Sequence, residues 1–362
     1  MGQPERFSKL TVTIQARPNH CPRCDSRWII KKGLRKNRYR QLQLYLCRDC
    51  GRYFTPIAGV KGATYHPSLI AEALCSYNLG HSQVEVACIL SRMHRPSVPA
   101  RTVCDWIARY RRITTVARLR AQIAALFSPD DVVTYKVLEH CLLYRFALHR
   151  GKLALLSDAV EDGARQRVAG YLEAVAGDAF PHDLFRREDT TEGQLRSSKL
   201  MLSLLPAMSI EKQNLANDLA SMGLLLARRN RDRHEAVQRF MLLNDSSTIA
   251  CEAPVYLMPR ELAHYQRAGF TISIPQSHAA VTGHIDVLQL RNGYVHILDY
   301  KPDADKVMPL SQLVIYALAL AARTGLPLKI FKCAWFDDKT YYEFFPLKAV
   351  YPLRAEGSSI KH

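Results

Sequence analysis

Two aspartates and a lysine are placed so that they could act together on one substrate. Asp299 and Lys301 are two residues apart in a segment with the pattern of a β-strand, so their side chains point to the same face. Asp286 lies in the preceding predicted strand, near the same end. Carboxylate oxygens bind Mg²⁺ or Mn²⁺, and a lysine can stabilise charge that builds on a phosphate. These residues predict metal-assisted phosphodiester hydrolysis, and an ordinary Asp–Lys ion pair beside a hairpin is the alternative.

The segments around these residues have the patterns of alternating helices and strands. The predicted elements are a helix over 231–243, strands over 248–257, 281–290 and 295–301, a helix over 310–323 and a strand over 328–336, with a short helix over 260–267. Asn292-Gly293 predicts a type I′ turn, which joins the second and third strands into a hairpin. Asp286 and Asp299 lie on the two arms of that hairpin.

Three short motifs occur in this region in a fixed order. They are Gly283-His284-Ile285-Asp286, Ile297-Leu298-Asp299-Tyr300-Lys301 and Gln312-Leu313-Val314-Ile315-Tyr316. In this order they resemble the GxxD, (D/E)xK and QxxxY motifs of the PD-(D/E)XK nuclease superfamily, RecB-like branch. The resemblance covers about residues 230–340. It implies an α/β restriction-endonuclease-like core and a metal-dependent nuclease activity.

The resemblance also implies roles for individual residues. Asp286 and Asp299 would be ligands of Mg²⁺ or Mn²⁺, and Lys301 would be the catalytic lysine. Gln312 and Tyr316 would line the site from the following helix, where a spacing of four residues puts both on one face. Ordinary helix packing is the alternative for these two residues. Asp299 stands where many members of the superfamily have Glu.

Members of the RecB-like branch also tend to have a metal-binding histidine on the first helix of the core. The predicted helix over 231–243 offers His234 for that role. By its angle around the helix, His234 is better aimed towards the apolar stripe than Glu235. A packed histidine without a metal is the alternative. Glu252 on the first strand is a further candidate ligand.

Four of the ten cysteines form two pairs with the spacing of metal ligands. Cys21 and Cys24 make the first CxxC pair, and Cys47 and Cys50 make the second. Four thiolates complete a tetrahedral Zn²⁺ shell and leave no open position, so the zinc would be structural. Two predicted strands with a glycine-bearing turn lie between the pairs, which indicates a zinc ribbon over residues 1–60. A redox or coincidental cysteine set is the alternative.

Positive charge is concentrated in the first third of the chain. Residues 1–120 contain 22 of the 50 basic side chains and 6 of the 33 acidic ones, a net charge of +16, whereas residues 121–362 have a net charge of +1. A strongly basic segment joined to a nearly neutral one is typical of a module that binds a polyanion. Nucleic acid is therefore the expected partner of this segment.

Residues 61–120 have the pattern of three short helices. The first is expected from Pro67 to Tyr77, the second from a cap at Ser82, and the third after a cap at Thr102. Apolar and aromatic residues recur on one face of the third helix. This pattern predicts a small helical packet with the third helix packed against the other two.

The opposite face of the third helix carries Arg101, Arg109 and Arg112. An aromatic inner stripe with an arginine-rich outer face suits the recognition helix of a helix-turn-helix, so these arginines are predicted to bind DNA. A generic helical packet with solvated arginines is the alternative. The ribbon from Cys21 to Phe54 and the helices ending at Arg112 together resemble the DNA-binding half of insertion-sequence transposases.

The middle of the chain gives little indication of chemistry. Residues 121–229 are expected to form a helical connector. Their apolar residues recur as on helix faces, for example at Val137, Leu138, Cys141, Leu142 and Phe146. A convincing acidic triad is missing from this segment, which disfavours an acidic-triad transposase.

The expected fold class is multidomain α+β. It comprises a zinc ribbon (1–60), a three-helix helix-turn-helix (61–120), a helical connector (121–229) and an α/β PD-(D/E)XK restriction-endonuclease-like core (230–362). The expected function is DNA binding with divalent-metal-dependent hydrolysis of DNA, linked to a mobile element or to DNA processing. A non-catalytic DNA-binding regulator or mobile-element accessory protein, with a degenerate nuclease domain, is the alternative.

The cellular setting is expected to be the cytoplasm, without a membrane. The longest uncharged apolar run, Leu313 to Ala322, is about half the length needed to cross a bilayer. The first residues do not lead into an apolar segment, so a secretory signal is not expected. Paired cysteines with metal-ligand spacing also indicate a reducing compartment.

Overall fold

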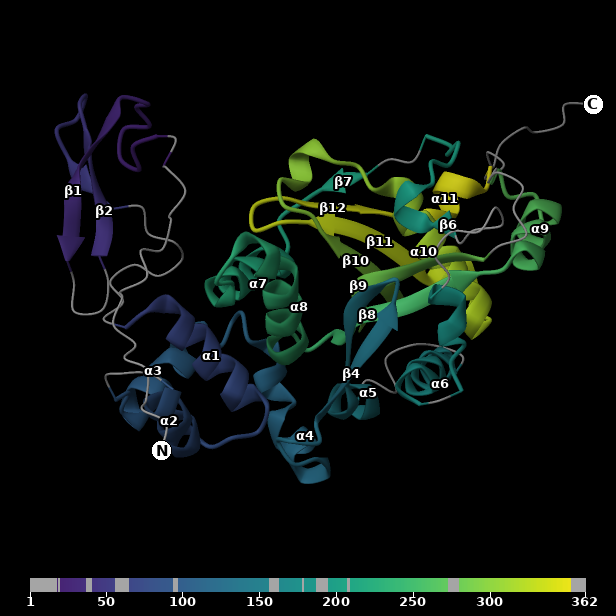
Figure 1. The fold of residues 1–362 in the computed structure, drawn as a ribbon, viewed down its shortest axis with the longest axis horizontal. Coiled ribbons are helices and arrows are strands. Elements are labelled where there is room, and N and C mark those ends of the chain that lie inside the picture. Colours follow the sequence, from purple (N-terminus) through teal and green to yellow (C-terminus); the bar gives the residue numbers. More distant parts are fainter. Residues whose placement is uncertain are drawn as a thin grey trace, which may run out of the picture. The chain divides into compact units, whose positions relative to one another are not determined.

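The computed structural model describes residues 18, 20–36, 41–55, 65–93, 97–155, 163–177, 179–186, 195–206, 209–272 and 280–352 of the 362-residue chain. The chain forms two compact units, Met1–Glu72 and Ala73–His362. The division into 1–60, 61–120, 121–229 and 230–362 that the sequence suggests stays a prediction. Both units contain β-sheet, and the second also contains most of the helices (Figure 1).

The first unit contains a three-stranded antiparallel sheet. Its strands, in sheet order, are β1 (Ile29–Lys36), β2 (Gln41–Cys47) and β3 (Tyr53–Phe54). Gly33 lies within β1 and not in the predicted turn. The register of the β1–β2 pair shifts between Lys31 and Leu34, and Gly33 has a φ of 86° at this irregularity. The residues between β1 and β2, 37–40, lie outside the described part of the chain.

Three helices follow, α1 (Pro67–Asn78), α2 (Gln83–Met93) and α3 (Ala100–Tyr110). Ser82 caps α2 as predicted: its Oγ accepts the Glu85 N–H at 3.2 Å, and the Glu85 carboxylate accepts the Ser82 N–H at 2.7 Å. The predicted cap at Thr102 is wrong. The helix α3 begins earlier, directly after Pro99, whose φ of −66° leads the chain into the helix without a side-chain cap.

Polar contacts within the second unit join the end of α1 to α8 (Arg233–Asn244). Asn78 Nδ2 donates to Asn244 Oδ1 at 2.8 Å, and both side chains are buried. The guanidinium group of Arg120 donates to the carbonyl group of Tyr77, in the last turn of α1, and to those of Gly80 and His81 just after the helix, at 2.7 to 2.9 Å. A buried amide without a partner is costly, so the hydrogen bond between Asn78 and Asn244 favours this arrangement of α1 and α8.

The second unit is built on a mixed nine-stranded sheet (Figure 1). In sheet order the strands are β4 (Val133–His140), β5 (Leu142–His149), β8 (Thr248–Leu257), β9 (Val281–Arg291), β10 (Tyr294–Tyr300), β11 (Phe331–Phe336), β12 (Tyr341–Phe344) and β7 (Ile210–Glu211), with β6 (Leu195–Arg196) paired to β9. Of these pairs, β10–β11 and β6–β9 are parallel. A parallel pair needs a crossover, and α10 (Leu310–Thr324) supplies it between β10 and β11.

The segment 121–229 is not a helical connector. It contains α5 (Arg150–Leu155), α6 (Ala164–Ala176), α7 (Leu215–Gly223) and most of α4 (Arg120–Leu126), but also the hairpin of β4 and β5. In that hairpin Val137 and Leu142 are exposed, whereas Leu138 and Phe146 are buried. The prediction failed because β5 pairs with β8, a strand far later in the sequence, and the hairpin thereby extends the main sheet.

The carboxy-terminal elements follow the predicted order. The helix α8 precedes β8, β9 and β10, α9 (Pro259–Arg267) lies between β8 and β9, and α10 precedes β11. Asn292 and Gly293 have φ values of 51° and 73°, as a type I′ turn requires. A 3₁₀ turn over Leu328–Ile330 replaces the start of the last predicted strand, and α11 (Pro346–Val350) follows β12.

The core of the second unit lies between the sheet and α10. Most residues of α10 are buried, and apolar side chains of β9, β10 and β11 join the same cluster. This packing holds α10 against the central strands, and residues of both form the site described below. Among the described helices, none is long and apolar enough to cross a membrane.

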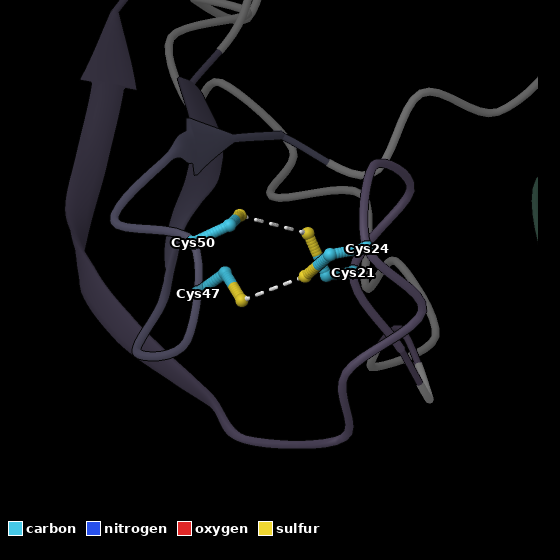
Figure 2. A group of neighbouring side chains, drawn as sticks. All are labelled: Cys21, Cys24, Cys47 and Cys50. Carbon is cyan, nitrogen blue, oxygen red and sulfur yellow. Dashed lines mark hydrogen bonds between the residues drawn. The ribbon is translucent and has the colours of Figure 1, made fainter.

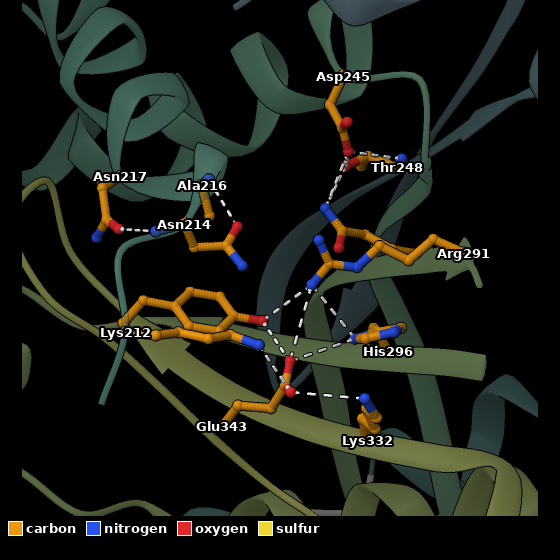
Figure 3. Close-up of polar contacts among 12 residues, drawn as sticks. Lys212, Asn214, Ala216, Asn217, Asp245, Thr248, Arg291, His296, Lys332 and Glu343 are labelled. Atoms are coloured by element: carbon orange, nitrogen blue, oxygen red, sulfur yellow. Dashed lines mark hydrogen bonds and ion pairs between the residues drawn. The ribbon is translucent and has the colours of Figure 1, made fainter. Parts of the chain in front are cut away.

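A polar cluster around Glu343 joins the strands on one side of the sheet (Figure 3). Its carboxylate lies 2.9 Å from Lys212 Nζ, 3.6 Å from Lys332 Nζ and 3.9 Å from Arg291 Nη2. The Tyr341 hydroxyl donates to Glu343 at 3.2 Å and accepts a hydrogen bond from Arg291 at 3.1 Å. The cluster therefore links β9, β11, β12 and the residue after β7, and it stabilises the edge of the sheet.

Candidate functional sites

Three carboxyl groups lie in one row across three neighbouring strands; we call Glu252, Asp286 and Asp299 the carboxylate row. The pairing of β8 with β9 places Glu252 opposite Asp286. Continuing the register of the β9–β10 pair by one residue places Asp299 opposite Asp286 on the other side. Residues directly opposed in antiparallel strands have Cβ atoms about 5 Å apart, so three acidic side chains meet at one place.

Lys301 follows β10 and supplies positive charge to the carboxylate row. Its Nζ lies 2.8 Å from Asp299 Oδ2 and 3.1 Å from Asp299 Oδ1. The backbone N–H of Lys301 donates to Phe336 O at 2.9 Å, which holds the residue beside β11. Asp286 Oδ2 accepts a hydrogen bond from the backbone N–H of Tyr300 at 3.1 Å. The structure thus brings together Asp286, Asp299 and Lys301.

Burial raises the pKa values of all three carboxyl groups, and repulsion between them adds to the effect. The pKa of Glu252 rises to about 7, that of Asp286 to about 6 and that of Asp299 to about 8. Burial alone would lower the pKa of Lys301, but the charges of Asp299 and Asp286 raise it, so the ammonium form persists. One lysine leaves the ionised row with surplus negative charge, which suits a divalent cation with oxygen ligands.

Glu252, a secondary candidate ligand in the sequence, lies in the carboxylate row. Its Oε1 accepts a hydrogen bond from Gln238 Nε2 of α8 at 2.7 Å. The residue has a φ of 51°, a conformation that non-glycine residues seldom adopt and that often accompanies function. The available signal was a single acidic residue in an otherwise apolar strand, because a carboxyl group among apolar residues needs an explanation.

His234 lies at the beginning of α8, close to the carboxylate row. Its ring contacts the Tyr300 ring edge to face, with 5.0 Å between centroids. Burial lowers the pKa of His234, so the imidazole is neutral at pH 7, which is the form that binds metals. Glu235 is exposed and pairs with Arg145 at 2.8 Å. Of these two neighbours, His234 is therefore the one placed beside the row.

Gln312 and Tyr316 lie on α10 next to the same site. Gln312 Nε2 donates to the Tyr316 hydroxyl at 2.7 Å, and both side chains line a cavity of about 180 Å³ together with two members of the carboxylate row. Gly283 permits this approach, because a Cβ there would overlap the Tyr316 ring and lie 2.5 Å from Ser197 Oγ. The absence of a side chain at Gly283, in the Gly-x-x-Asp motif, thus leaves space for the ring of Tyr316, in the Gln-x-x-x-Tyr motif.

The four paired cysteines converge in the first unit (Figure 2). All four Sγ atoms lie within 4.8 Å of one another, with 3.7 Å between Cys21 and Cys50 and 3.6 Å between Cys24 and Cys47. Tetrahedral zinc with Zn–S bonds of about 2.3 Å separates its sulfur ligands by about 3.8 Å, which fits this spacing. The backbone N–H of Cys50 lowers the pKa of the Cys47 thiol to about 6, whereas the pKa of the Cys24 thiol rises to about 12, because a hydrogen bond from the Ser26 N–H is outweighed by desolvation and the neighbouring cysteine sulfurs. This cluster could bind zinc.

The arginines predicted to contact DNA lie at the surface. Arg101 and Arg109 are exposed on α3, and Arg112 is exposed just after it. Arg101 Nε lies 3.3 Å from the carboxylate of Asp105 one turn later. The opposite face of α3 is buried through Val103 and Trp106, as the apolar pattern predicts.

The second unit thus combines a mixed sheet that carries acidic residues on three adjacent strands, a lysine beside them, and a crossover helix that carries Gln312 and Tyr316. In a comparison with protein families, residues 171–338, in the carboxy-terminal part of the chain, match the model of the PD-(D/E)XK nuclease superfamily. Members of that superfamily are mostly nucleases that use divalent metal ions. The match begins within α6, earlier than the boundary expected at residue 230.

The match contains the carboxylate row, Lys301, Gln312, Tyr316 and His234. Comparisons with curated proteins and with solved structures found no match.

Proposed function

We propose that the protein is a DNA-binding, divalent-metal-dependent deoxyribonuclease. The observation that supports this most strongly is the carboxylate row with Lys301 at its end, in a domain of a nuclease superfamily. Three carboxyl groups of raised pKa, of which Asp299 is fully buried and the other two partly buried, are costly to hold together unless a cation binds them. Structural ion pairs rarely combine such crowding with a strained backbone at one of the acidic residues.

The residues have distinct roles in this proposal. Asp286 and Asp299 hold Mg²⁺ or Mn²⁺, with Glu252 and His234 as further ligands from the adjacent strand and helix. A divalent cation bound there neutralises charge on the phosphate and activates water for attack. Lys301 keeps its ammonium group beside Asp299 and stabilises the negative charge that develops on the phosphate. Gln312 and Tyr316 position the substrate strand from α10.

The other proposed sites would bring DNA to this centre. Cys21, Cys24, Cys47 and Cys50 would hold a structural Zn²⁺ that stabilises the ribbon. The basic residues of the first third, including Arg101, Arg109 and Arg112, would bind the DNA backbone in a helix-turn-helix. Four reduced thiolates require a reducing compartment, so we place the protein in the cytoplasm. The resemblance of this third to transposase DNA-binding regions favours a role in mobile-element or DNA processing.

The test is cleavage of labelled DNA by the purified full-length protein with Mg²⁺ or Mn²⁺, on linear, circular and single-stranded substrates. Wild-type protein should cleave, Asp299→Asn should not, and chelation of the added metal should stop the reaction. Asp303→Asn is the matched control, because Asp303 is an exposed aspartate four residues further on. Equal cleavage by Asp299→Asn and wild type would refute the site assignment. No cleavage by wild type with either metal would favour the non-catalytic DNA-binding alternative.

A further inference from the structure

The cavity beside the carboxylate row extends to an arginine that the proposed mechanism does not use. Arg196 lines this cavity together with Glu252, Asp286 and Tyr316. The Arg196 side chain is partly buried. Within the described part of the chain, its guanidinium group has no ion pair with a carboxylate. A partly desolvated arginine without an anionic partner is unfavourable, and a bound anion would relieve it.

Two contacts determine where Arg196 lies relative to the carboxylate row. The strand β6 pairs in parallel with β9, and this pairing sets Arg196 beside Thr282. The next residue, Ser197, is buried and adjoins Gly283 and the Tyr316 ring. Arg196 is thus attached both to the strand that carries Asp286 and to the residues that α10 contributes.

The distance along β9 separates Arg196 from the metal ligands. Thr282 precedes Asp286 by four residues, which is about 13 Å along an extended strand. The Arg196 backbone is thus offset along β9 from Asp286, while its side chain lines the same cavity as Glu252 and Asp286. A phosphate at Arg196 would then be a close neighbour of one held at the carboxylate row through a cation. Nucleic acid strands present phosphates at short regular intervals, so one strand can occupy both places.

We propose that Arg196 forms a phosphate-binding subsite for the substrate strand, next to the scissile phosphate. This inference rests on the proposed nuclease function for the identity of the strand. For the subsite it rests on the cavity and on a guanidinium group that pairs with no carboxylate of the described residues. Arginine suits this role because its planar group donates two parallel hydrogen bonds to phosphate oxygens. Arg196 is a positioning residue here and does not contact the reacting atoms.

The first test measures binding without cleavage. Thymidine 3′,5′-bisphosphate is titrated calorimetrically into the full-length protein, as wild type, Arg196→Gln and Arg196→Lys. Arg196→Gln should weaken binding by about tenfold or more, the effect of losing a hydrogen bond to a charged group, and Arg196→Lys should retain part of the affinity. Lys199→Gln is the matched control, because Lys199 is an exposed cation three residues on that does not line the cavity. It should bind as wild type does.

The second test uses single-turnover cleavage of oligonucleotides in which one neutral methylphosphonate replaces a phosphate next to the cut. Wild type should lose about tenfold in kcat/KM at one such position, and Arg196→Gln should show no further loss there, because the charge pair is already absent. Equal bisphosphate affinity of wild type and Arg196→Gln, or no bisphosphate binding by wild type, would overturn the subsite. Arg196-dependent binding without any cleavage would support the subsite and refute the nuclease proposal.

Discussion

Glu252 and Asp286 lie opposite each other on adjacent antiparallel strands, and Glu252 holds a φ of 51° at this position. A positive φ at glutamate costs on the order of 1–3 kcal/mol, and the partly buried carboxyl group adds a desolvation cost. The hydrogen bond from Gln238 offsets only part of this. The strained residue and its charge therefore coincide with the proposed metal site, as expected where function conflicts with stability.

The carboxylate row should make the stability of the protein depend on pH when no divalent metal is added. The folded-state pKa values of about 6 to 8 exceed the ordinary values of 3.8 and 4.5. Between about pH 4 and pH 8 the folded state then binds more protons than the unfolded state, so the free energy of unfolding should fall as the pH rises. Denaturant unfolding at several pH values, with and without Mg²⁺, measures this; Mg²⁺ should restore stability at pH 8.

Glu252→Gln tests how the charge of the Glu252 carboxylate affects stability and Mg²⁺ binding, because it replaces one carboxylate oxygen with an amide NH₂ group. Glutamine keeps an oxygen that can accept the Gln238 hydrogen bond but removes one negative charge. The variant should be more stable than wild type at pH 8 without metal, should gain less from Mg²⁺, and should cleave DNA at least tenfold more slowly. If its Mg²⁺-induced stabilisation equalled that of wild type, Glu252 would not be a ligand.

Lys301→Met should slow the chemical step of cleavage and leave the affinity for Mg²⁺ unchanged. The lysine donates no ligand atom to a cation, but it lies 2.8 Å from Asp299 and would face the phosphate. Removing one group that stabilises charge in a transition state typically slows turnover by about 10²–10³-fold. Single-turnover cleavage and calorimetric Mg²⁺ titration separate the two effects. Lys306→Met, at an exposed lysine, should cleave as wild type does; a fully active Lys301→Met would remove Lys301 from the mechanism.

Gly283→Ala should impair the site through Tyr316. The new methyl group would overlap the Tyr316 ring and lie 2.5 Å from Ser197 Oγ, so α10 or the segment around Ser197 must shift. Cleavage should fall at least tenfold while circular dichroism still shows a folded protein, since small displacements of positioning groups are costly in rate. Gly170→Ala is the control: this glycine in α6 has open space around it, and alanine should stabilise by about 0.5–1 kcal/mol. Unchanged cleavage by Gly283→Ala would show that Tyr316 is not needed.

Local signals explain why much of the carboxy-terminal core was predictable from the sequence. Asn292-Gly293 specifies its turn through backbone conformations that few other residue pairs adopt, and the turn sets the register that brings Asp299 to Asp286. The apolar pattern of α10 likewise marks a buried helix. Both features can be predicted from a few residues that are neighbours in the sequence.

Long-range pairing explains what the sequence did not reveal. The spacing of Leu138 and Phe146 also fits a helix, and only the pairing of β5 with β8 makes that segment a hairpin. The role of Glu252 depends on the same kind of information, because it emerges only when β8 is aligned with β9. Arg196 is placed by a two-residue strand that has no periodic pattern of its own.

One zinc ion per chain should bind to the cysteine cluster. Cys47→Ser should lose the zinc and the folded ribbon, because a small three-stranded sheet has little core of its own and metal binding is coupled to folding. Metal analysis by mass spectrometry and proteolysis of the first unit measure both effects. Cys88→Ser is the control, since Cys88 is an exposed cysteine on α2 outside the cluster. Zinc retained at one equivalent in Cys47→Ser would contradict the assignment.

The basic first third should determine DNA affinity, and α3 should contribute to it directly. The double variant Arg109→Ala, Arg112→Ala removes two exposed cations, so the slope of log affinity against log salt should decrease in magnitude by about two as two phosphate contacts are lost. Arg260→Ala, Arg267→Ala removes the same charge from the exposed side of α9 and serves as the matched control. Fluorescence anisotropy with a labelled duplex at several salt concentrations gives both slopes. Equal slopes for the two double variants would mean that net charge alone determines binding, whereas a selective loss in the α3 variant would support a specific DNA-binding face on that helix.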